Sequence, residues 1–282
     1  MSLDLQVPEE LLLEIVQHLP KETLQYVSLA HRTLRHISRP FLFADFVFHP
    51  YGMRYMPADR SRVRWPEADD PMCLHDEAQD HEVERLKFWS SSGIAPFVRS
   101  CSIIPLNSRD WAEQKAADTP TALLDIFFER LPHFAGIHHF HAYMVHFTQI
   151  GLANLCGLPR LTRLQIIQCR SPEPLDCSSL ELPRIRAFEL QHVLYYKPAL
   201  DLWMRLLRRG QLAEVDLAFA PVCLTRIAQN LPVFSHANKL TLRSLRVGDN
   251  LMPPALPSVL PILRKFPNAT NFVMEGRWGE KG

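Results

Sequence analysis

Apolar residues near the start of the chain are spaced as in a series of short helices. From Leu11 to Leu19, six of the nine residues are apolar, on more than one side of a helix that begins at Pro8. Pro20 ends this helix and begins a second, because proline lacks the N–H that a helix interior requires. A third helical stretch follows, with apolar residues at Leu34, Ile37 and Phe41. Three such short helices are too small to be stable alone, so their surplus apolar surface predicts a partner.

A second pattern recurs from residue 98 to near residue 275. In each unit an apolar residue is followed by another three positions later and by a third two positions after that. Seven units share this frame, beginning at Val98, Ile137, Leu161, Ile185, Leu212, Ala237 and Ala269. Most steps between them are 24 to 27 residues, within the range typical of leucine-rich repeats, and the longer ones indicate insertions. Cys169 occupies the asparagine-or-cysteine position of that repeat consensus.

Helical stretches are expected between these units. They cover residues 121–131, 149–156, 198–209, 221–231 and 256–266. A strand and a helix cannot bury their own apolar faces alone, so stacked units would share a core. We therefore predict an α/β fold: a curved, irregular leucine-rich-repeat-like solenoid with parallel inner strands and outer helices. Its expected parts are a three-helix domain at 1–48, a linker with one helix at 49–97, and the solenoid at 98–282.

The N-terminal segment, residues 5–48, resembles an F-box. In chain order, the matching features are Val7-Pro8-Glu9-Glu10-Leu11, Leu19-Pro20, Val27-Ser28-Leu29, Arg32-Thr33-Leu34-Arg35 and Arg39-Pro40-Phe41-Leu42-Phe43, with Val7 in place of the more usual leucine. The resemblance implies docking onto the Skp-type adaptor of a cullin-based (SCF) ubiquitin ligase. The adaptor contacts that it implies are Pro8, Leu11, Leu12, Ile15, Leu19 and Leu24. The alternative is an ordinary N-terminal three-helix cap.

Charged side chains are expected on the inner face of the solenoid. Because strand residues alternate between faces, the third, fifth and seventh residues of each unit point out of the sheet. The candidate target contacts are His139, His141, Tyr143, Arg163, Glu189, Glu214, Asp216, Lys239 and Arg243. An acidic centre with basic flanks could select a partner segment by charge complementarity. Alternatively, the charges simply pair with one another across the strands.

Two clusters contain residues of metal-ligand type. His139 and His141 project from one strand face, but no third ligand is indicated, and a solvated surface remains the alternative. Residues 75–82 are rich in histidine and acids, and they are interpreted either as a metal site or as a solvated acidic turn before a helix.

Composition excludes several classes of function. The net charge is +1, which gives no strong field for nucleic acid or an acidic membrane. We find no secretory signal and no apolar run long enough to span a membrane. Six cysteines without a CxxC pair indicate reduced thiols in the cytoplasm or nucleus. The chain has no hydrolase, zinc-protease or phosphate-loop motif, so we expect no catalysis and no cofactor.

The sequence thus predicts a non-catalytic substrate receptor of an SCF-type ubiquitin ligase. Its F-box would bind the adaptor and the cullin scaffold, and its solenoid would bind an unidentified target protein. The alternative is an F-box and repeat scaffold that does not direct degradation. A small hydrolase with a hidden site is a third class.

Overall fold

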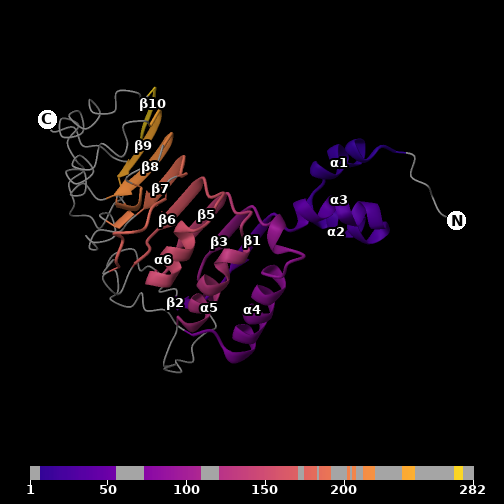
Figure 1. Cartoon of the computed structure of the whole chain (residues 1–282), viewed down its shortest axis with the longest axis horizontal. Helices are drawn as coiled ribbons and strands as arrows, with labels where there is room; N and C mark the ends of the chain where they lie inside the picture. The colour runs from indigo at the N-terminus through magenta and orange to yellow at the C-terminus, as the bar shows by residue number, and fades with distance from the viewer. Residues whose placement is uncertain are drawn as a thin grey trace.

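The chain forms a three-helix unit that leads into a long parallel sheet with helices along one face (Figure 1). The computed structural model describes residues 7–54, 73–108, 121–170, 175–182, 184–191, 202–203, 205–207, 212–219, 237–244 and 270–275. All structural statements below concern these residues. The helices expected at 221–231 and 256–266 lie outside them.

The three-helix unit consists of α1 (Glu9–Gln17), α2 (Lys21–Ala30) and α3 (Arg32–Leu42). Pro8 and Pro20 precede the first two helices, as the sequence predicts. At the start of α3, the His31 side chain accepts a hydrogen bond from the backbone N–H of Thr33 at 3.2 Å. The unit has a small core of its own, made of Val16, Leu24 and Ile37 with Leu12, Leu19, Val27, Phe41 and Leu42 packed around it.

Eight described strands form the main sheet, and every neighbouring pair is parallel. In spatial order they are β1 (Asp45–Phe48), β3 (Ser100–Ile103), β5 (His139–Tyr143), β6 (Arg163–Ile167), β7 (Ala187–Gln191), β8 (Glu214–Phe219), β9 (Lys239–Ser244) and β10 (Asn271–Glu275). A small parallel pair, β2 (Gly52–Arg54) and β4 (Leu106–Ser108), follows β1 and β3 along the chain. The predicted α/β architecture with stacked parallel strands is confirmed.

The register of the sheet matches the repeating apolar frame. The second apolar position of every predicted unit lies in one row across the strands: Cys101, Phe140, Leu164, Phe188, Val215, Leu240 and Phe272. Residues of β5, β6 and β7 alternate between buried and partly exposed, so one side of each strand faces the core. The frame therefore predicted both the strand positions and their alignment.

The sheet begins earlier than the sequence predicted. β1 follows α3 after only Phe43 and Ala44, and Phe46 pairs in register with Cys101 of β3. Phe46 and Phe48 are buried in the main core, where the Phe48 ring stacks on Phe127 at 5.0 Å. The strand that ends at residue 48 thus belongs to the sheet, and no linker separates the three-helix unit from it. The segment 49–97, expected to be a linker with one helix, contains the helix α4 (Asp76–Trp89) and, in addition, the strand β2.

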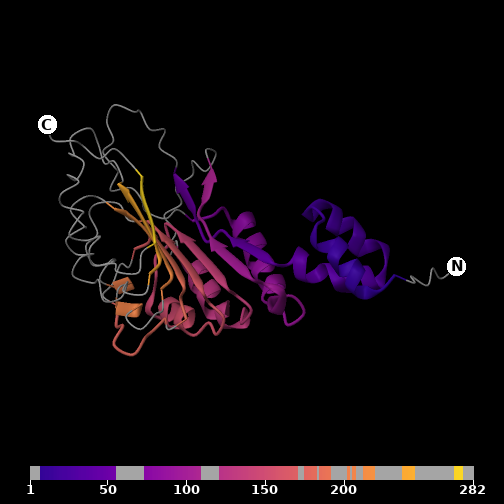
Figure 2. The ribbon, with the colours of Figure 1, turned by 90° about the horizontal axis from the view of Figure 1, so that it is seen from above.

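Three described helices cover one face of the sheet (Figure 2). They are α4, α5 (Ala122–Arg130) and α6 (Gln149–Cys156), followed in the chain by helical residues at 202–203 and 205–206, of which Trp203 and Leu206 are buried. Leu124 and Phe127 of α5 and Leu152 of α6 are fully buried against the strands. The described units therefore have outer helices, as predicted. We call the opposite side of the sheet the open face, and it carries the polar residues.

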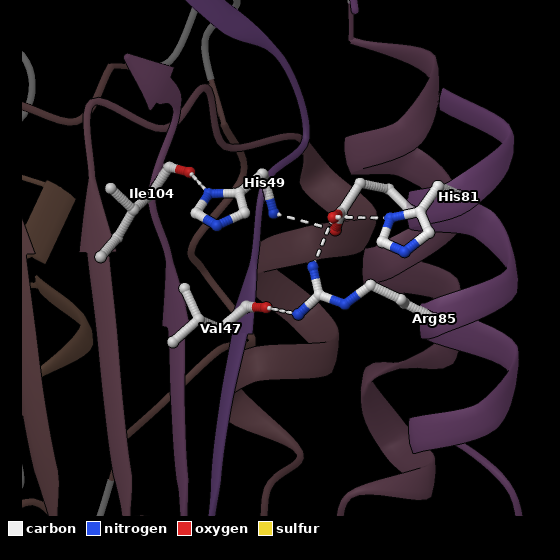
Figure 3. A network of polar contacts seen from close by, with 6 residues as sticks. Val47, His49, His81, Arg85 and Ile104 are labelled. Carbon is white, nitrogen blue, oxygen red and sulfur yellow. Dashed lines mark hydrogen bonds and ion pairs between the residues drawn. The ribbon is translucent and has the colours of Figure 1, made fainter. Parts of the chain in front are cut away.

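The first edge of the sheet is covered by α4 (Figure 3). Glu82 is buried, and its carboxylate accepts hydrogen bonds from the Arg85 guanidinium and from the backbone N–H of His49 at 3.4 Å. Arg85 also donates to the carbonyl oxygen of Val47 at 3.0 Å. These two backbone groups point away from β3, because Phe48 O accepts from Ile104 N on the other side. The side chains of α4 therefore satisfy an edge that would otherwise be open to another strand.

This contact corrects the interpretation of residues 75–82. The helix begins at Asp76, so the acidic segment is not a turn before the helix but its first two turns. Asp76 and Glu77 lie where the helix dipole favours negative charge. Among the described residues, no three potential metal ligands lie close enough together to hold an ion.

Replacing Gly151 by alanine should destabilise the packing of α5 on α6. A Cβ atom at this position would lie 2.5 Å from the ring of Phe128, closer than van der Waals contact permits. Overpacking costs about 1–3 kcal/mol, and the better helix propensity of alanine returns less than about 1 kcal/mol. We expect a net loss of about 1–2 kcal/mol, measured by urea unfolding. Gly93→Ala, where nothing lies within 4 Å of the added atom, is the matched control and should change stability little.

Candidate functional site

The three-helix unit exposes apolar side chains on α1. Leu11 and Ile15 lie one turn apart on the same face, and Ile15 is 57% exposed. Leu13 is also exposed, and it lies on the opposite side of the buried residue Val16 from Leu11 and Ile15. The apolar arc of α1 is therefore wider than the unit can cover, which agrees with the surplus seen in the sequence.

The predicted adaptor contacts divide into exposed and internal residues. Pro8, Leu11 and Ile15 are exposed, whereas Leu12 and Leu19 pack against the small core of the unit. Leu24 is only 2% exposed and lies inside that core, so its assignment as a surface contact is wrong. Its side of α2 faces the unit's interior, because Val27, one turn later, packs against the same core.

Sequence reasoning missed a second apolar surface on α2. Tyr26 is 75% exposed and Leu29 is 74% exposed, and they lie one turn apart. Leu29 does not share the buried side of this helix, where Leu24 and Val27 lie. Its position three residues after Tyr26, outside the stripe of Leu24 and Val27, was the signal available in the sequence.

The open face carries a line of three linked charges. The Glu214 carboxylate lies 3.6 Å from Nη2 of Arg163 and 3.5 Å from Nζ of Lys239. Arg163 is on β6 and Glu214 on β8, so the guanidinium reaches over Ala187 of β7, which is too short to block it. All three side chains are about half exposed, and such ion pairs contribute little, roughly 0–1 kcal/mol each.

A chain of hydrogen bonds crosses the three strands β5 to β7. Nε2 of His139 bonds to Oε1 of Gln165 at 2.7 Å, and Nε2 of Gln165 donates to Oε2 of Glu189 at 2.5 Å. Because an amide oxygen only accepts, this arrangement places the proton of His139 on Nε2. The orientation of the Glu189 carboxylate is thereby linked to two side chains on neighbouring strands.

His141 lies beside this chain in a less polar position. Burial lowers its pKa, the neighbouring His139 lowers it further, and Glu189 partly opposes both effects. The ring is therefore neutral at neutral pH. Its Nε2 atom is buried and has no hydrogen-bond partner in the described part of the chain.

A shallow hollow of about 80 Å³ lies on the open face over β6 to β9. Its polar lining consists of Arg163, Gln165, Glu189, Glu214, Asp216, Lys239 and Thr241, and Ala187 also lines it. Five of the predicted target contacts thus meet at one place. Of the others, His139 adjoins the hollow through Gln165, and His141 and Tyr143 do not line it. The side chain of Arg243 lies outside the described structure.

The described cysteines are unsuited to nucleophilic chemistry. Burial raises the pKa of the Cys156 and Cys169 thiols to about 12, and it raises that of Cys101 as well. These thiols are protonated at neutral pH, whereas the thiolate is the nucleophile. No helix in the described residues is both long and apolar enough to span a bilayer.

No protein family model matches this chain, and no curated protein matches it in sequence. Membership of a family is therefore not shown for either part of the chain. Two features of the described residues bear on function. They are the exposed apolar residues of the three-helix unit and the charged hollow on the sheet.

Proposed function

We propose that this protein is an F-box substrate receptor of a cullin-based, SCF-type ubiquitin ligase. The observation that carries the proposal is the unburied apolar surface of the three-helix unit, formed by Leu11, Ile15, Tyr26 and Leu29. This unit lies at one end of the sheet (Figure 1). The open face of that sheet carries the hollow lined by charged residues. One surface would bind a Skp-type adaptor, and the other would bind a target protein.

Details of the strand-to-turn junction support a leucine-rich-repeat-like assignment for the sheet. The Cys169 thiol, at the consensus asparagine-or-cysteine position, donates to the carbonyl oxygen of Ala142 in the preceding unit at 3.2 Å. Met144 and Gln168 follow paired strand residues and both adopt left-handed backbone angles, with φ of 52° and 53°. The same turn thus recurs in two successive units.

The proposed mechanism is tethering without a catalytic group. A target held on the sheet would be kept near the ubiquitin-loading enzyme, which raises its effective concentration there. The direct connection of α3 to β1 favours a defined distance between the two surfaces. An ion pair of Lys21 with Asp45 at 2.7 Å and the edge-to-face packing of Phe43 on Trp89 brace this junction.

Adaptor binding would use the exposed face of α1 as a helix docked in an apolar groove. Burial of one large aliphatic side chain contributes about 1.5–3 kcal/mol, so Leu11 and Ile15 together would supply part of the binding free energy of the complex. The proposed ligase acts in the cytoplasm or nucleus, without nucleic acid, membrane or cofactor as a partner.

We expect Ile15→Asp to reduce co-purification of the Skp-type adaptor and the cullin by at least about tenfold. The substitution removes an exposed apolar contact and places a charge where an apolar groove would close. Gln17→Asp adds the same charge to an exposed polar position of the same helix and is the matched control. Far-ultraviolet circular dichroism would verify that both variants fold. Equal capture of both variants would refute this docking surface.

The scaffold alternative uses the same two surfaces but does not direct degradation. It differs in the fate of the bound protein. A target that accumulates when the proteasome is blocked, and only in cells with an intact Ile15, supports the ligase role. A target whose abundance is unaffected supports the scaffold.

A further inference from the structure

The helix α3 carries its positive charges along one face. Arg32, Arg35 and Arg39 are spaced by three and four residues, which places them in a row on one side of the helix. The residues that pack in the small core of the unit, among them Ile37 and Phe41, lie on the opposite side. The row, called the basic row below, therefore points away from the core, and Arg32 and Arg35 are exposed.

The three arginines of the basic row form no ion pair within the described part of the chain. The sequence explains why, since residues 23–44 contain three arginines and two histidines but no acidic residue. Asp45, the next acid along the chain, pairs with Lys21 of α2 at 2.7 Å instead. The positive charge of α3 is therefore not compensated by neighbouring side chains.

An exposed apolar surface lies at the start of the basic row. Tyr26 and Leu29 are exposed on α2, which packs beside α3 (Figure 1). Only His31 separates the two helices along the chain, so the Cα atoms of Leu29 and Arg32 are at most about 11 Å apart. Tyrosine and arginine are enriched among the residues that dominate the binding energy of protein interfaces. Two independent features, unpaired charge and exposed apolar side chains, thus meet at the corner of α2 and α3.

The charge pattern favours a protein partner over a membrane or a nucleic acid. Segments that bind anionic lipid carry clusters of about four to eight basic residues, and proteins that bind the DNA backbone make on the order of 6–10 phosphate contacts. The basic row has three arginines over about 10 Å of helix. In the same unit, α1 exposes Glu9, Glu10 and Glu14 and has no basic residue, so an extended anionic surface would be repelled there.

We propose that the corner of α2 and α3 binds an acidic amphipathic helix of a partner protein. Carboxylates spaced by three and four residues on that helix pair with the basic row, and an apolar side chain packs on Tyr26 and Leu29. A guanidinium suits a carboxylate because it donates two parallel hydrogen bonds. The apolar contact supplies affinity, and the charges orient the helix and select the partner. The inference rests on the proposed docking role of the three-helix unit, but it uses different helices from the α1 face of Leu11 and Ile15.

The test measures binding of synthetic helices to the full-length chain by fluorescence anisotropy. The acidic probe is an alanine-rich helix with two leucines one turn apart and with glutamates at positions i, i+3 and i+7. A second probe has glutamine in place of each glutamate, and a third has the same composition as the first with its glutamates dispersed around the helix. The acidic probe should bind about tenfold more tightly than the glutamine probe, a difference of about 1.4 kcal/mol, and several-fold more tightly than the dispersed probe. Raising the salt concentration should reduce both differences.

Variants of the chain connect this preference to the basic row. Arg32→Gln, Arg35→Gln and Arg39→Gln combined should make the acidic and glutamine probes bind equally. Leu29→Ser should weaken all three probes alike, because each carries the leucines. The matched control replaces three exposed arginines elsewhere in the chain by glutamine, which changes the net charge equally and should preserve the preference. They are Arg160, Arg186 and Arg205. Circular dichroism verifies that each variant remains folded.

Three results would overturn the inference. They are equal or undetectable binding of the acidic and glutamine probes, an acidic preference that survives substitution of the basic row, and binding of phosphatidylserine vesicles or a DNA duplex through these arginines without binding of the acidic probe. Adaptor capture by the Ile15→Asp variant reports on the α1 face, so the two proposals fail separately. If the acidic preference requires the basic row but no adaptor is captured by the unsubstituted chain, the basic row is assigned correctly and the ligase role is not.

Discussion

Replacing Phe46 by alanine is expected to destabilise the protein by about 3–5 kcal/mol. The Phe46 ring is 1% exposed and packs against four aromatic rings, including Trp89 at 5.0 Å and Phe134 at 5.6 Å. Truncation would leave a cavity among rigid rings that cannot collapse to fill it. The melting temperature should fall by on the order of 10 °C, as measured by calorimetry or circular dichroism.

The control is Phe88→Ala on α4. Phe88 is about half exposed and contacts Phe43 and Trp89 at the surface, so the same truncation should cost less than about 1 kcal/mol. The comparison tests whether β1 is part of the main core or only the end of the three-helix unit. Similar losses for Phe46→Ala and Phe88→Ala would contradict the placement of β1 in the sheet.

The sequence predicted the sheet because its signal is repeated. Each unit carries the same three apolar positions, and parallel stacking aligns them in rows, so one frame fixes the strands and their register. β1 was missed although Phe43, Phe46 and Phe48 fit the same frame. These residues directly follow a helix and were included in the F-box-like segment, and 55 residues separate Phe43 from Val98 at the start of the next unit.

The candidate site could be predicted only as a set of side chains on one face. Strand alternation placed Glu189, Glu214 and Asp216 together, and the structure agrees. The reach of Arg163 across β7 depends on the small size of Ala187 and on side-chain conformation, which the apolar pattern does not encode. Leu24 was misassigned for a related reason. An apolar residue on a small amphipathic helix can face either its own unit or a partner, and only the packing decides between them.

Helix α4 shows that the sequence pattern also does not predict which way a polar side chain faces. The sequence predicted that Glu82 lies in a metal site or in a solvated acidic turn before a helix, because residues 75–82 are rich in histidine and acids. In the structure this carboxylate points toward the edge of the sheet. There it accepts the backbone N–H of His49, which would otherwise be available to a further strand. Natural sheets protect their edges in several ways, including cover by a helix. Helix α4 thus covers the edge of the sheet at β1 in place of a further strand.

Replacing Glu82 by glutamine should therefore cost about 2–3 kcal/mol, although the change preserves the shape of the side chain. The amide removes a charge that Arg85 neutralises, and its NH₂ group would oppose the guanidinium donors or the N–H of His49. The estimate lies below that for a fully buried pair because the Arg85 side chain is 31% exposed and water can partly replace its partner. Urea unfolding measures the loss.

Glu84→Gln is the matched control on the same helix, since Glu84 forms an exposed pair with Lys87 at 2.6 Å that should contribute less than about 1 kcal/mol. Hydrogen exchange separates a local from a general effect. If Glu82 covers the sheet edge, the amide of His49 should lose protection in Glu82→Gln more than amides in the central strands β6 and β7 do. Equal destabilisation by the two substitutions, with no selective loss at His49, would show that α4 does not stabilise the edge through this carboxylate.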